Sequence, residues 1–264
     1  MLISVINHTS GLIIDSDVQT AIRAVNRQLA EDFASHWGMT ATLRLEGPRG
    51  SLTGAQAVDQ ASEFNGEAVI YLWHPVDVPM ALGFHARNHL GVPYGFVFPE
   101  VARQLEEPWT AAFSHEALEM VADPDVNLMV MGPHPVDARR TVFHWYEVCD
   151  AVQGETYRID GVPVSNFLLP LYFTNTEERG SRNDFLGHSH FGRTLASFGA
   201  NPGGYVGFFD PQAVKHEKYF AEGDMVAQHR LAVKQQLGLA RRSVRYEFRT
   251  RANVPVTSAL KQFM

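Results

Sequence analysis

The sequence contains a single cysteine, Cys149, among its 264 residues. One cysteine cannot form a disulfide within the chain, and it excludes a zinc module built from several cysteines. No apolar run approaches the roughly 20 residues that a membrane-spanning helix requires. The first residues also lack the basic stretch followed by a long apolar stretch that is typical of a secretory signal. We therefore expect a soluble, cytoplasmic protein with no membrane partner.

Basic residues are also too few for a nucleic-acid-binding protein. With 29 acidic and 22 basic residues, the formal net charge is −7, whereas phosphate binding requires concentrated positive charge. The charge is uneven, because eight Lys or Arg follow Gly223 against only Asp224 and Glu247, a local charge of about +6. Tyr246 and Phe248 alternate with arginines there as in a strand, so we interpret this segment as solvated or self-neutralising.

Several nucleotide and hydrolase fingerprints are missing. The sequence has no P-loop and no GxSxG turn, and "GGYVG" has the wrong spacing for a dinucleotide site. What it does have is an apolar fraction of 45% with 19% charged residues, which is typical of a chain that buries a sizeable core.

The first part of the sequence alternates between strand-like and helix-like segments. Apolar residues at three- and four-residue spacing predict a helix from Asp17 that ends at Gly38. A second helix is expected over about 108–122, ended by Asp123 because the residue before a proline disfavours helical geometry. Strands are expected at four β-rich runs, residues 2–7, 39–47, 68–74 and 92–98.

The chain after Pro124 is expected to be loop-rich, with short β-like runs between turn signals. A last helix is predicted over Met225–Leu237, before the basic segment. The fold class predicted is α+β, as one domain over 1–264. Its N-terminal α/β lobe, about 1–124, has a mixed sheet and the helix at 108–122, and its C-terminal lobe, about 125–264, is loop-rich.

The segment "FSHEALEMVADPD" (113–125) carries the clearest chemical pattern. On a helix, His115 and Glu119 lie one turn apart on the same face, so both could bind one ion while Glu116 projects beside it. Zinc peptidases with an HExxH helix use this spacing, with the glutamate as general base. The pattern predicts a divalent metal, Zn²⁺, bound by His115 and Glu119, with Glu116 as the catalytic base. Because HExxE is short, an ordinary solvated acidic helix face is the alternative.

A catalytic zinc site has three protein ligands, and the sequence offers two acids as the third. Asp125 has the ten-residue spacing from His115 that is found in HExxHxxGxxH peptidases. Ala122, however, stands where those proteins have glycine, and Pro124 changes the path of the chain.

The other candidate, Glu147, lies in "HWYEVCD", an apolar segment whose other acid is Asp150. An isolated buried carboxylate is costly, so a cation would explain an acid there. A salt bridge from Glu147 to Arg139 or Arg140 is the structural alternative.

The motifs together resemble a mostly uncharacterised family of bacterial and phage-associated proteins with an HExxE core. The matching stretches are "SHEALEMVADP" (114–124), "EVCD" (147–150), "YRIDGVPVSNFLLPLYF" (157–173) and "PGGY" (202–205), together with "AVNRQLAEDFASHWG" (24–38). The resemblance implies a zincin-like, metallopeptidase-related fold that forms one unit.

This resemblance also bears on the roles of single residues. It favours Glu147 over Asp125 as the third ligand, with Asp123 and Asp150 as groups that support the ligands or end the helix. In a zincin, "VPYGFVF" (92–98) would be the edge strand that binds a peptide substrate by strand addition.

The function predicted is metal-dependent hydrolysis of a peptide or small-molecule amide. Glu116 would deprotonate the attacking water and then protonate the leaving amine. Two alternatives stay open. One is a non-catalytic binding or structural protein of a phage or secretion apparatus, and the other is a redox or lyase enzyme that uses His188 or His190 of "GHSHFG" beside the helix ligands.

Three further residues have a structural and a chemical interpretation. His134 stands between Gly132-Pro133 and Pro135, which favours a turn over a metal ligand. Tyr146 and Tyr205 could donate a hydrogen bond to an oxyanion, although a buried tyrosine is more often a core residue with a paired hydroxyl.

Overall fold

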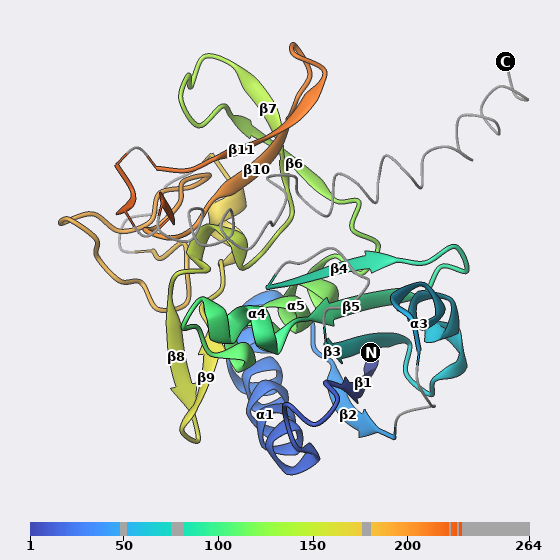
Figure 1. The fold of residues 1–264 in the computed structure, drawn as a ribbon. Helices are drawn as coiled ribbons and strands as arrows, with labels where there is room; N and C mark the ends of the chain where they lie inside the picture. The colour runs from blue at the N-terminus through green and yellow to red at the C-terminus, as the bar shows by residue number, and fades with distance from the viewer. Residues whose placement is uncertain (48–51, 75–81, 176–180, 222, 226, 229–264) are drawn as a thin grey trace, which may run out of the picture.

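The computed structural model describes residues 1–47, 52–74, 82–175, 181–221, 223–225 and 227–228 (Figure 1). The strands are β1 (Leu2–His8), β2 (Thr42–Glu46), β3 (Ala68–Trp73), β4 (Gly83–Arg87), β5 (Pro93–Val97), β6 (Met129–Pro133), β7 (Thr141–Trp145), β8 (Thr156–Ile159), β9 (Val162–Ser165), β10 (Val206–Asp210) and β11 (Lys215–Tyr219). The α-helices are α1 (Asp15–Arg27), α2 (Ala34–Trp37), α3 (Gly54–Gln60), α4 (Pro99–Gln104) and α5 (Trp109–Ala122), and the short helical turns are η1 (Gln28–Phe33), η2 (Ala61–Glu63), η3 (Asp150–Val152) and η4 (Pro170–Phe173). None of the described helices is long and apolar enough to cross a membrane.

The N-terminal part contains a five-stranded sheet in the order β2-β1-β3-β5-β4. Four strands are parallel, and β4 pairs antiparallel with β5. Helix α1 connects β1 to β2, and α3 connects β2 to β3, as expected for parallel neighbours that need crossover connections. The predicted α+β class with a mixed sheet is confirmed.

Both faces of this sheet are covered, which explains why every residue of β3 is buried. On one face, α1 and α5 pack on alternate strand residues such as Val5 and Ile70. On the other face, α3 and α4 pack on an aromatic layer that includes Tyr71 and Phe96. Burial on two faces requires the continuous apolar run "AVIYLW" rather than an alternating one.

The first helical segment runs from Asp15 to Trp37 and contains one π-helical stretch, η1. It ends where predicted, at Gly38, whose φ of 65° is left-handed. The predicted second helix is α5, and it ends at Ala122, before Asp123-Pro124. The strands expected at 2–7, 39–47, 68–74 and 92–98 correspond to β1, β2, β3 and β5.

Two expectations about the sheet need correction. The strand in 92–98 is not at the edge, because β5 lies between β3 and β4. In the part of the chain that the structure describes, the edge next to α5 is β4, a strand that the sequence patterns missed. Its residues Phe84 and Ala86 point to the aromatic layer, so the intervening His85 faces the opposite side, toward α5.

The C-terminal part is more regular than the loop-rich chain we expected. It contains an antiparallel sheet in the order β11-β10-β7-β6 and a β8-β9 hairpin that packs against α1 and α5 (Figure 1). The helix predicted over Met225–Leu237 and the basic segment after it lie almost wholly outside the described residues. Whether 1–264 forms one domain stays a prediction.

Candidate metal centre

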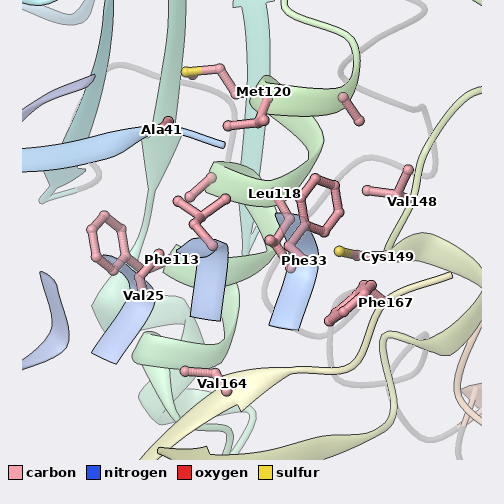
Figure 2. Close-up of a cluster of buried hydrophobic side chains, with 14 of the residues drawn as sticks. Val25, Phe33, Ala41, Phe113, Leu118, Met120, Val148, Cys149, Val164 and Phe167 are labelled. Atoms are coloured by element: carbon pink, nitrogen blue, oxygen red, sulfur yellow. The ribbon is translucent and has the colours of Figure 1, made fainter. Parts of the chain in front are cut away.

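Helix α5 has one apolar face and one face with ionisable side chains. Phe113, Leu118 and Met120 are fully buried in the core that α5 shares with α1, η1 and β9 (Figure 2). This packing fixes the rotation of the helix. Its other face therefore directs His115, Glu116 and Glu119 toward β4 and toward the segment "EVCD" (147–150), and both glutamates are buried.

Strand β4 adds a histidine to this face. The side chain of His85 is 2% exposed, and its Nδ1 lies 3.2 Å from Oε2 of Glu116 and 3.8 Å from Oε2 of Glu119. Gly83, two residues earlier on the same face of the strand, makes room for Glu116, because a β-carbon there would lie 2.6 Å from its Oε1. The edge strand and α5 thus enclose Glu116 between them.

The segment after β7 brings two more acids. The backbone N–H of Cys149 donates to Oε1 of Glu119 at 3.1 Å, which ties the segment to α5. On either side of this bond, Glu147 and Asp150 are 8% and 7% exposed. This segment therefore brings two buried acids close to Glu119 in the chain that contacts α5.

Five of these ionisable side chains form two groups of possible metal ligands that share Glu119. Ligand atoms of His85, Glu119 and Glu147 all lie within 4.8 Å of one another, as do those of His115, Glu119 and Asp150. Two donors at about 2.1 Å from one ion are at most about 4.2 Å apart, so small side-chain movements would complete either set. The buried group of His85, Glu119 and Glu147 could hold a metal ion.

The charges of these groups depend strongly on one another. Burial alone would raise the pKa of Glu119, but the nearby His115 and His85 rings and the Cys149 N–H lower it to about 2. Burial alone would lower the pKa of His115, but Glu119 and Asp150 raise it well above its ordinary value. The carboxylates of Glu119 and Asp150 therefore stabilise the protonated form of the His115 ring.

Glu116 behaves differently from Glu119. Burial raises its pKa, and the hydrogen bond with His85 only partly opposes this effect. A carboxyl with a raised pKa is better suited to take up and release a proton than one with a strongly lowered pKa. The surroundings thus shift the pKa values of the two glutamates in opposite directions.

The C-terminal lobe borders the centre through Tyr205 and Lys218. Burial and the hydrogen bond to the Asp150 carboxylate raise the pKa of Tyr205 well above its ordinary value. The Nζ of Lys218 lies 3.7 Å from the centroid of the Tyr205 ring, a cation–π contact. Burial lowers the pKa of Lys218, while Asp150 and Glu119 oppose this shift. Sequence patterns singled out Tyr205 but not Lys218.

The other predicted acids belong to neither group of possible ligands among the described residues. Asp125 is half-exposed, and its Oδ1 lies 2.9 Å from Nη1 of Arg87. Asp123 is buried and accepts hydrogen bonds from the backbone N–H groups of Asn127 and Leu128, so it shapes the turn after α5.

The arginines considered as partners of Glu147 pair elsewhere. Arg139 bonds Asp137, and Arg140 bonds Asp210. The structural alternative for Glu147 was a salt bridge to Arg139 or Arg140. These two arginines instead form salt bridges with Asp137 and Asp210.

The remaining candidates have structural surroundings. His190 bonds Glu155, and Nδ1 of His188 lies 3.8 Å from the same carboxylate, so both belong to a separate polar group. Nδ1 of His134 accepts from the backbone N–H of Val136 and Asp137, which is a turn. Tyr146 packs on aromatic core residues.

His85 is the residue of the centre that sequence patterns missed. The signal was present, because "GFHAR" and "VPYGFV" flank "NHLG", a turn-forming segment. The Asn88 side chain accepts from the N–H groups of Leu90 and Val92, which closes this hairpin.

Comparisons with known proteins add no function. No family model matches the chain, and no curated protein matches it. A solved structure described as "Structure of a chaperone-substrate complex" contains a chain with 12% sequence identity and a TM-score of 0.31. The match covers 52% of this chain and 26% of that one, so this chain spans about a quarter of the length of the chain it matches.

Proposed function

We propose that the protein is a metal-dependent hydrolase that cleaves a peptide or amide bond. The observation that carries the proposal is the buried convergence of the HExxE helix with two further acids and a second histidine, where His115, Glu119 and Asp150 have ligand atoms within 4.8 Å of one another. Imidazole and carboxylate are suitable donors for a divalent first-row ion such as Zn²⁺.

The hydrolytic ion would be held by His115 and Glu119, the two residues that the motif predicted as ligands. Asp150 is the acid grouped with His115, whereas Glu147 is grouped with His85. When bound, the ion would polarise the substrate carbonyl and acidify a water molecule.

Glu116 lies beside these ligands and performs the proton transfers. Its carboxylate takes the proton from the attacking water and returns it to the leaving amine. His85, at 3.2 Å, orients this carboxylate. The Tyr205 hydroxyl, next to Asp150, is placed to donate to an oxyanion when it turns from that carboxylate.

The fold proposed is zincin-like. Its support is the mixed sheet with one antiparallel edge strand, β4, directly beside the helix that carries the motif. An extended peptide added along β4 would place a backbone carbonyl near Glu116.

The test compares the wild type with Glu116→Gln, using the Zn²⁺-loaded full chain and a library of internally quenched peptides. The glutamine keeps the shape of the side chain but cannot accept a proton. We expect unchanged zinc content and a loss of activity of roughly 10²–10⁴-fold, the usual size of general-base catalysis. Full activity of Glu116→Gln would remove the base assignment. Absence of cleavage by the zinc-loaded wild type would favour a non-catalytic binding or structural role.

A further inference from the structure

We infer that the centre holds two divalent ions, with Glu119 as the shared ligand between them. The first ion is that of the proposed function, bound by His115, Glu119 and Asp150. The second is bound by His85, Glu119 and Glu147. The inference rests on the proposed function for the first ion only.

The grouping of the donors favours two ions over one. Among the described residues, His85 joins the group with Glu147, and His115 joins the group with Asp150; Glu119 is in both. One zinc ion accepts about four ligands, fewer than the five donors available when Glu119 is counted once. A single ion could therefore not bind all five donors.

Glu119 has the geometry of a bridging carboxylate. Its Oε1 is held by the Cys149 N–H at 3.1 Å. Its Oε2 faces both histidines, 3.3 Å from Nε2 of His115 and 3.8 Å from Nδ1 of His85. Two-ion hydrolase sites have their ions about 3.5–4 Å apart, and Oε2 of Glu119 lies near a histidine of each group.

The acidity of the cluster is compatible with more than one cation. Its four acidic residues, Glu116, Glu119, Glu147 and Asp150, are each at most 8% exposed. Carboxylates that are buried together are stabilised by nearby cations.

The surroundings of His85 give an independent reason for a second ion. Its imidazole is almost fully buried and points Nδ1 into the cluster, and no hydrogen-bond partner for its Nε2 is found among the described residues. Buried polar atoms are normally paired. An ion bound through Nε2 would give this nitrogen the partner that the described residues do not supply.

The experiment counts ions on the full chain. Protein stripped with a chelator is titrated with Zn²⁺ alone and measured by calorimetry and elemental analysis. We expect about two ions per wild-type chain, about one in His85→Gln, about one in Asp150→Asn, and markedly weaker binding at both sites in Glu119→Gln. The matched control is His89→Gln, which removes an exposed histidine of the adjacent turn that lies near Asp59 and should leave the count unchanged.

A second measurement needs no variant. The wild type loaded with Mn²⁺ should give the electron paramagnetic resonance spectrum of a coupled pair. One isolated ion per chain, unaffected by His85→Gln, would overturn the two-ion inference and leave the proposed function standing. One ion lost in both His85→Gln and Asp150→Asn would also overturn it, because a single shared ion is then present. Absence of any bound ion would reject both proposals.

Discussion

Replacing Gly83 with alanine tests whether β4 sets the position of Glu116. A β-carbon at Gly83 would lie 2.6 Å from Oε1 and 2.7 Å from Cγ of Glu116. Ordinary contacts between carbon atoms are about 3.5–4.0 Å, so the glutamate side chain must move by roughly 1 Å. None of the proposed metal ligands is altered by this substitution.

The substitution is expected to lower both activity and stability. A misplacement of about 1 Å can cost about 10²-fold in rate, which corresponds to about 2.7 kcal/mol in the activation free energy. Overpacking costs roughly 1–3 kcal/mol in the free energy of unfolding, and each kcal/mol lowers Tm by about 2–4 °C for a chain of this size.

The assay measures kcat and KM on a quenched peptide cleaved by the wild type, together with zinc content and Tm. Gly47→Ala is the matched control, because a β-carbon at Gly47 meets nothing within 4 Å among the described atoms and its backbone is not left-handed. We expect Gly83→Ala to keep its zinc and lose kcat, and Gly47→Ala to resemble the wild type. If Gly83→Ala retained the kcat of Gly47→Ala, the assignment of Glu116 as a base positioned by β4 would be wrong.

Two further predictions concern metal-linked and acid stability. Added Zn²⁺ should raise the Tm of the wild type and of Asp125→Ala equally, and that of Glu147→Ala less, because this variant loses a ligand of the second proposed ion; an equal rise in all three, measured by calorimetry, would remove Glu147 as a ligand. Burial lowers the pKa of His144 to about 4, below the ordinary value of about 6.5, so the fold favours the neutral ring. The neutral His144 ring therefore adds roughly 3 kcal/mol to the free energy of unfolding. This stabilisation is complete above pH 6.5 and is lost as the pH falls toward 4. The fall in unfolding free energy between these pH values should therefore be smaller in His144→Gln, and an equal fall would contradict the prediction.

The parts of the centre that could be predicted from the sequence depend on short-range geometry. His115, Glu116 and Glu119 lie within little more than one turn of α5, so helical spacing alone places them together. The strands of the parallel region were also recognisable, because burial on two faces demands long apolar runs such as that of β3.

The parts that could not be predicted depend on contacts between distant segments. His85 reaches α5 only because β4 turns back antiparallel on β5, and the polar residues of "GFHAR" interrupt the apolar pattern by which a strand is recognised. The sheet formed by β6, β7, β10 and β11 was missed for a similar reason. A strand such as β11, "KHEKY", is only partly buried and carries alternating charges, so it has little hydrophobic signal.

Glu119 is the point at which these distant segments meet. Helix packing sets the direction of its side chain, the Cys149 amide fixes one oxygen, and the other oxygen faces histidines from α5 and from β4. Acids from the segment after β7 complete each group. An ion at this proposed centre would contact β4, α5 and the segment 147–150 together, and binding to the folded chain alone would stabilise that fold by mass action. The proposed metal binding would therefore stabilise the packing of these three segments against one another.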